Sequence, residues 1–231
     1  MRFLMLLRKE LRESLPWILL VAIGFLAIGG FILRLEARYD RSTWHDWRFA
    51  PGSSISSYQL THYSVLTLPG AWLFAVSIGL GLILGVQHFW IPGFTRTWPF
   101  LLHRSVGRMS VLGAKLAAAT IGFVASLGFV WIAFYWYVCR PEVLPVPAPV
   151  RVFIDGWVFI VLGLVVYLAT ALTGLSRARW YTTKIFGLAF LTLILFATVV
   201  QCSPGWAFVV TVISIVVLLS QVIDRFLNRE Y

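Results

Sequence analysis

The sequence predicts an all-α protein that crosses a membrane several times, and three observations support this class. Of its 231 residues, 60% are hydrophobic and only 12% are charged, and the mean hydropathy is +0.86. Several apolar runs reach about 18 residues, the length at which a helix can cross a bilayer. Eleven Trp and eight Tyr suit the aromatic belts at the two membrane surfaces.

The net charge of +10 would suggest nucleic-acid binding in a soluble protein. Here the positive residues lie between the apolar runs, where they orient a membrane protein, so we expect no nucleic-acid partner.

We expect Met1–Leu15 to form an amphipathic helix that lies in the membrane interface before the first span. A secretory signal peptide is the competing interpretation, but the acidic Glu10 and Glu13 and the lack of a small-x-small cleavage site argue against it. The apolar stripe of this helix consists of Leu4, Leu7, Leu11 and Leu15. Its polar side carries Arg2, Lys9 and Glu13.

Six apolar runs then predict six membrane spans. Pro16 begins the first span, at a position where a proline costs no hydrogen bond. In the second span Gly79, Gly81 and Gly85 offer a smooth surface to a neighbouring helix. The third run is longer than a bilayer needs, so we expect it to tilt or to project. The spans are Pro16–Leu35, Val65–Val86, Met109–Val138, Val152–Leu175, Ile185–Val200 and Gly205–Ile223.

The positive residues predict that both termini are inside, because inner segments collect Lys and Arg. In that orientation the inner segments hold 13 of the 19 Lys and Arg. The chain is then a single transmembrane domain over 1–231 with a cytosolic tail at 224–231. The longest outer loop, Glu36–Ser64, is polar and aromatic, and we expect it to form a small cap or short helices.

The stretch Phe94–Lys115, between the second and third spans, is basic and contains no acidic residue. A helix starting at Trp98 would have Thr97 as its N-cap and would tolerate Pro99 in its first turn. Its spacing predicts a short amphipathic helix at the membrane surface, and a solvated positive loop is the alternative. The mostly apolar side of that helix would consist of Trp98, Leu101, Leu102 and Ser105. The opposite side would consist of Arg96, Pro99, Phe100 and His103, with Arg104 beside them.

The predicted spans carry no Asp, Glu, Arg or His near their middle, and we expect Lys115 to snorkel to the inner surface. Carriers coupled to ions or protons need buried ionisable groups in their spans, so an energy source outside the spans is favoured. The sequence has no phosphate-binding loop, HExxH motif or paired-carboxylate motif. We therefore expect no catalytic residues and no cofactor on this chain.

Two weaker candidates lie on the predicted outer side. His45, Asp46 and His62 are residue types that could bind a metal ion. We expect their side chains to be solvated instead, without a metal. Cys139 and Cys202 could form a disulfide bond there, because oxidation is possible on the outer side. We expect unpaired thiols instead.

These features resemble the membrane-spanning permease subunit of type 2 ATP-binding cassette (ABC) transporters, most of which are exporters. The resemblance covers nearly the whole chain: the leader with Arg8-Lys9-Glu10, the six spans and the loop between spans 2 and 3. In that loop family members commonly show Gly-Thr, then Phe-Leu-Leu, a Pro-Val-Ser-Arg turn and a Lys that enters the third span. The matching residues here are Arg96-Thr97, Phe100-Leu101-Leu102, Ser105-Val106-Gly107-Arg108 and Lys115.

The resemblance implies a membrane subunit that works with a separate cytosolic ATPase, which binds the ATP and Mg. It implies a homodimer or heterodimer of permeases in the cytoplasmic (inner) membrane, with Arg8, Lys9 and Glu10 in an interfacial connecting helix. A membrane scaffold or assembly factor without transport activity is the alternative. The residues implied to couple to the ATPase are Arg96, Thr97, Trp98, Pro99, Phe100, Leu101, Leu102, His103, Arg104 and Arg108.

Overall fold

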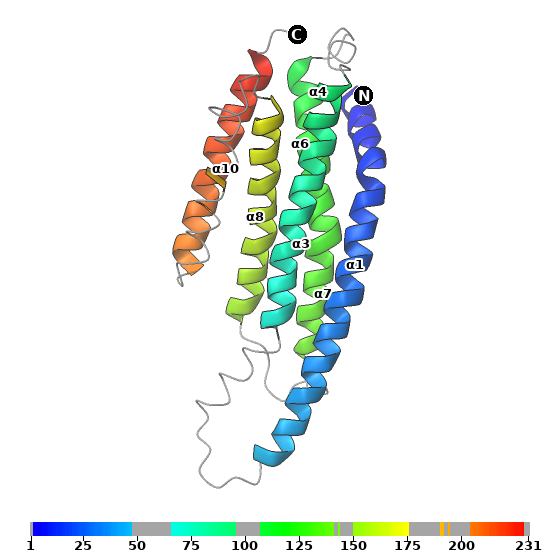
Figure 1. Cartoon of the computed structure of the whole chain (residues 1–231), viewed down its shortest axis with the longest axis vertical. Coiled ribbons are helices and arrows are strands. Elements are labelled where there is room, and N and C mark those ends of the chain that lie inside the picture. Colours follow the sequence, from blue (N-terminus) through cyan, green and yellow to red (C-terminus); the bar gives the residue numbers. More distant parts are fainter. Residues whose placement is uncertain are drawn as a thin grey trace.

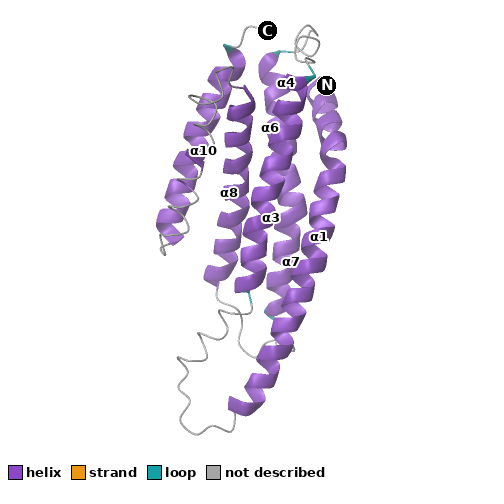
Figure 2. Cartoon of the chain, viewed as in Figure 1, coloured by secondary structure: helices purple, strands orange, loops and turns teal. Residues whose placement is uncertain are grey.

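The computed structural model describes residues 2–47, 66–95, 107–140, 143, 150–175, 190, 191, 194 and 204–228. Regular structure within these residues is helical throughout, without a strand (Figure 2). The predicted all-α class is confirmed. Five helices in the described part are long and apolar enough to cross a membrane: Phe3–Leu35, Leu68–Phe94, Arg108–Val138, Val150–Leu175 and Trp206–Leu227.

The helices lie side by side in an elongated bundle (Figure 1). Two of the membrane-length helices contain a π-helical turn, η1 in the second and η2 in the third. In chain order the elements are α1 (Arg2–Trp47), α3 (Thr67–Gly85), η1 (Val86–Trp90), α4 (Ile91–Phe94), α6 (Arg108–Phe123), η2 (Val124–Gly128), α7 (Phe129–Val138), α8 (Val150–Leu175) and α10 (Pro204–Leu227).

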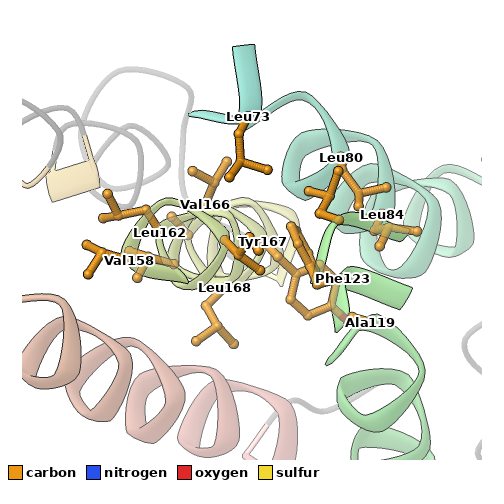
Figure 3. Close-up of a cluster of buried hydrophobic side chains, with 14 of the residues drawn as sticks. Leu73, Leu80, Leu84, Ala119, Phe123, Val158, Leu162, Val166, Tyr167 and Leu168 are labelled. Carbon is orange, nitrogen blue, oxygen red and sulfur yellow. The ribbon is translucent and has the colours of Figure 1, made fainter. Parts of the chain in front are cut away.

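Helix α8 is the centre of the bundle, and it packs most extensively against α3 and α10. Figure 3 looks along α8 and shows Leu80 and Leu84 from α3 and Phe123 from α6 gathered around it. Most side chains between Gly156 and Leu175 are buried, as a nearly continuous apolar sequence requires.

The leader is not a separate interfacial helix, which corrects the prediction for Met1–Leu15. Residues 2–15 are the first turns of α1, which continues without a break through the first span to Trp47. The helix therefore also includes the start of the predicted outer loop Glu36–Ser64. From Glu10 onward one face of α1 turns into the bundle, and its buried residues are Glu10, Ser14, Ile18, Val21, Phe25, Gly29 and Leu33.

The other described spans agree with their predicted ranges, with one extension. The third, fourth and sixth predicted spans match α6–η2–α7, α8 and α10 within a few residues. The second helix continues about two turns past the predicted end at Val86, through η1 and α4 to Phe94. Most of the predicted fifth span, Ile185–Val200, lies outside the described residues.

Some helix ends lie at the upper end of the bundle in Figure 1 and the others lie at its lower end. α1 and α6 begin, and α4, α8 and α10 end, at the upper end in Figure 1. A hydrogen bond from the Arg108 guanidinium Nη1 to the backbone carbonyl of Leu227, at 2.8 Å, joins the start of α6 to the end of α10 there. At the lower end the indole of Trp131 in α7 donates to the carbonyl of Phe153 near the start of α8, at 3.1 Å.

Small residues allow α3 to approach α8 closely. Ser77, Gly81 and Gly85 follow one another at intervals of four, so they share one face of α3. A Cβ on Gly81 would meet the backbone carbonyl of Gly163 and would lie 3.0 Å from the Cβ of Val166. The two backbones therefore touch at positions where a side chain has no room, as in other tightly packed membrane helices.

This contact predicts different outcomes for two neighbouring glycines of α3. We expect Gly81→Ala to destabilise the protein by about 1–3 kcal/mol, because the added methyl group overpacks the contact. Gly79→Ala is the matched control, since a Cβ at Gly79 would meet nothing within 4 Å. Thermal unfolding in detergent measures both variants, and equal melting temperatures for the two would contradict the packing described.

Candidate functional site

Only part of the predicted coupling set falls in the described structure. Arg96, Thr97, Trp98, Pro99, Phe100, Leu101, Leu102, His103 and Arg104 lie outside the described residues, so their predicted helix stays a prediction. Arg108 is the first residue of α6, is exposed, and donates to the end of α10.

The three predicted leader residues divide into two environments. Arg8 and Lys9 are exposed, and Lys9 Nζ lies 3.6 Å from a carboxylate oxygen of Glu13 in an exposed pair one helical turn apart. Glu10 is only 5% exposed and faces the interior of the bundle. Glu10 lies in a helix, as the sequence predicts, and the structure buries the face of that helix on which it lies.

The partner of Glu10 is Lys115 of α6, which is 3% exposed. Lys115 Nζ donates to Glu10 Oε2 at 2.9 Å. This contact corrects the expectation that Lys115 snorkels to the surface. Glu10 precedes the predicted first span, Pro16–Leu35, so the prediction that no span carries an acidic residue near its middle is unaffected. An ionised pair is the form in which such groups are tolerated in an apolar interior.

His88 of η1 lies beside this pair and is 1% exposed. The Tyr167 hydroxyl donates to the backbone carbonyl of Lys115 at 3.3 Å, so its oxygen accepts from His88 Nδ1 at 3.0 Å. With its proton on Nδ1, the ring accepts at Nε2 from the hydroxyl of Ser14 at 2.9 Å. The network thus assigns a neutral ring whose two nitrogens both have partners. Nε2 also lies 3.9 Å from Glu10 Oε2.

The π-helical turn η1 explains why one short stretch contacts two different helices. A π-turn contains an extra residue relative to an α-helix and so redirects the side chains around it. Gln87 Nε2 donates to the backbone carbonyl of Glu13 in α1 at 2.8 Å. Trp90 Nε1 donates to the carbonyl of Thr170 in α8 at 3.0 Å. Within five residues η1 therefore reaches α1 on one side and α8 on the other.

We call Glu10, Ser14, His88, Lys115 and Tyr167 the polar cluster. It joins α1, η1, α6 and α8 at the upper end of the bundle. His88 precedes Phe94, the last residue of α4, by six residues, and Lys115 follows Arg108, the first residue of α6, by seven. At a rise of 1.5 Å per residue these side chains lie about 10 Å along their helices from the predicted coupling segment. The cluster thus fixes both helices that flank that segment.

The contacts of the cluster favour a structural role over bond-making chemistry. The carboxylate and the ammonium group neutralise each other, and both ring nitrogens of His88 are engaged. Across the described ranges no group of three or more His, Cys, Asp or Glu side chains is placed to hold a metal ion. Cys139 is a free thiol, and its possible partner Cys202 lies outside the described residues.

The sequence contains one signal that indicates this site. A lysine within an apolar run needs a nearby acid, and Glu10 is the acid that α1 offers in register with Ser14 and Ile18. The sequence gives no comparable indication that His88 belongs to the cluster. Its position depends on a π-helical turn, and its partner Tyr167 lies 79 residues later in the chain.

Comparison with known proteins adds no relative: searches of protein-family models, curated proteins and solved structures find no match.

The buried pair predicts a large difference between two ion pairs of α1. We expect Glu10→Gln or Lys115→Met alone to cost about 3–5 kcal/mol of stability, because each leaves an uncompensated buried charge. The double variant is expected to cost much less than the sum of the two single losses. Thermal unfolding of the four proteins in detergent measures this double-mutant cycle.

The exposed pair Lys9–Glu13 is the matched control for this cycle, with side chains 49% and 52% exposed. Replacing either partner there is expected to change the stability by about 0–1 kcal/mol. Additive losses at Glu10 and Lys115 would show that the two groups do not interact.

Proposed function

We propose that this chain is the membrane-spanning permease subunit of an ABC transporter, an exporter whose ATP is hydrolysed by a separate chain. The observation that carries the proposal is the polar cluster. It ties the two helices that flank residues 96–106 to α1 and α8, the outer and the central helix of the bundle. A force applied to that segment would therefore reach most of the bundle.

The positions of the helix ends support a six-span topology. α8 ends at the upper end of the bundle and α10 begins at the lower end, so the 28 residues between them have to return along its length. The apolar run Ile185–Val200 suits that return. An even number of spans places both ends of the chain on one side, and the positive-inside rule makes that side the cytosol.

Of the described positive residues with exposed side chains, five lie at the upper end of the bundle, and three, Arg34, Arg140 and Arg151, lie toward the lower end. Arg8, Lys9, Arg12, Arg108 and Arg225 are exposed and belong to helix ends at the upper end of the bundle. The segment 96–106, which begins after α4 and ends before α6, would then face the cytosol, where an ATPase could dock.

In the proposed mechanism the ATPase supplies the work and this chain transmits it. Closure of two ATPase subunits would press on residues 97–104 of each permease. The paired charges would make α1 and α8 follow α4 and α6, because separating the charges is costly in an apolar interior. The motion would alternate access to a path between two permease chains.

The buried charges do not favour an ion-coupled carrier instead. Coupling requires an ionisable group that exchanges its ion or proton with both sides of the membrane. Glu10 is held by Lys115, and His88 by Ser14 and Tyr167, so each group is occupied by another side chain. An external source of energy therefore remains the better account.

A scaffold or assembly factor without transport activity is the second candidate. The close packing of Gly81 on Gly163 and the paired polar cluster would also suit a rigid membrane anchor. Affinity purification of the tagged chain from native membranes separates the candidates. A co-purifying ATPase with a phosphate-binding loop supports the transporter, and non-ATPase partners alone support the scaffold.

The coupling assignment predicts that Phe100→Ala with Arg104→Ala weakens the ATPase association roughly tenfold or more, since aromatic and Arg contacts dominate interfaces. Quantitative co-purification measures the loss. Arg140→Ala is the matched control, because Arg140 lies past the end of α7, at the lower end of the bundle, and packs over Trp136 at 4.0 Å. Undiminished ATPase binding in the double variant would refute the assignment.

A further inference from the structure

The way in which α1 is anchored changes along its length. In residues 3–15 the buried side chains are Glu10 and Ser14, both polar. From Ile18 to Leu33 the buried side chains of the same face are apolar, among them Val21 and Phe25. The fully buried side chains of the first four turns are therefore polar, with the half-buried Leu6 packed against the core beside them, whereas the buried side chains of the remainder are apolar.

A proline separates the two parts. Pro16 lies inside α1, where it has no N–H to donate to the carbonyl of Arg12, and its ring crowds that carbonyl. One residue further on, the carbonyl of Glu13 accepts a hydrogen bond from Gln87 of η1. The backbone is weakest at this point, and a side chain from the neighbouring helix supports it there.

The outward side of residues 2–15 has the composition of an interfacial helix. Leu4 and Leu15 are exposed on the bundle, and so are Arg8, Lys9 and Arg12. Leucines beside a row of positive side chains are typical of a helix that binds a lipid surface. These turns would thus be stabilised both against the bundle and against the membrane surface.

We propose that residues 2–15 form a segment hinged at Pro16 with two positions, docked on α6 through Glu10 and Lys115, or released onto the membrane surface. In the docked position the polar cluster is complete. In the released position Glu10 and Ser14 leave the bundle, and Lys115 takes water or a lipid headgroup as its partner. η1 and α6 then lose their polar contacts with α1 but keep the apolar contacts beyond Pro16, such as Ile18 against Gly122. The segment would regulate how rigidly the upper end of the bundle moves, whether or not an ATPase binds there.

Distances between spin labels on the full-length chain in lipid nanodiscs test the proposal. One label pair replaces Met5 and Met109, which are exposed on α1 and α6 at the upper end of the bundle. The control pair replaces Ile23 and Phe129, exposed on α1 beyond Pro16 and on α7. Cys139 and Cys202 are replaced by Ser in every variant.

We expect one dominant distance for the first pair in the parent protein. Glu10→Gln should increase a longer-distance population about tenfold or more, because the buried pair is lost. Ser14→Ala keeps both charges and should produce a smaller increase in the longer-distance population. This variant provides a second test of the proposal if Glu10→Gln does not fold. Adding Pro16→Ala to Glu10→Gln should reduce the longer population, because the hinge is removed. The control pair should keep its distance throughout.

Three results would overturn the proposal. Distances for Met5 and Met109 that do not change in Glu10→Gln and Ser14→Ala would show that the cluster does not hold the segment. A comparable change in the control pair would show general loosening of the bundle. An unchanged longer population after Pro16→Ala would show that Pro16 is not the hinge.

Discussion

The ion pair between Glu10 and Lys115 is the constraint on which the upper end of the bundle depends. Either charge alone would be expensive to bury among apolar helices, so each fixes the position of the other. The pair sets the register of α1 on α6, and it lies against His88, which extends the connection to α8 through Tyr167. The ion pair and the hydrogen bonds of His88 together connect four helices.

The centre and the upper end of the bundle follow different physical rules. Along α3 and α8 the contact depends on shape, because Gly81 and Gly163 bring the backbones together and leave no room for rearrangement. At the upper end the contacts are polar and directional, and they can be exchanged for other polar partners. A membrane protein that transmits motion needs both, a stiff centre and an end whose contacts can be broken and remade.

Helix positions were accessible from the sequence, whereas the polar cluster left only one signal there, the need of Lys115 for a nearby acid. Apolar length alone located α8, α10 and the helix from Arg108 to Val138, since a bilayer imposes that length. In the leader, periodicity identified an amphipathic helix correctly but could not tell which side faces inward. In a membrane protein an apolar side is free to face lipid, and here Glu10 faces protein. The polar Gln87 and His88 read as the end of a span, although a π-helical turn carries them into the bundle.

In the proposed mechanism, work enters this chain from the cytosol, between α4 and α6. Labelling of a single cysteine introduced at position 104, in a chain without Cys139 and Cys202, tests it most directly. We expect a membrane-impermeant thiol reagent to modify this cysteine in inside-out vesicles and not in intact cells. Modification in intact cells would place the segment on the outer surface, away from any cytosolic ATPase, and would contradict the account.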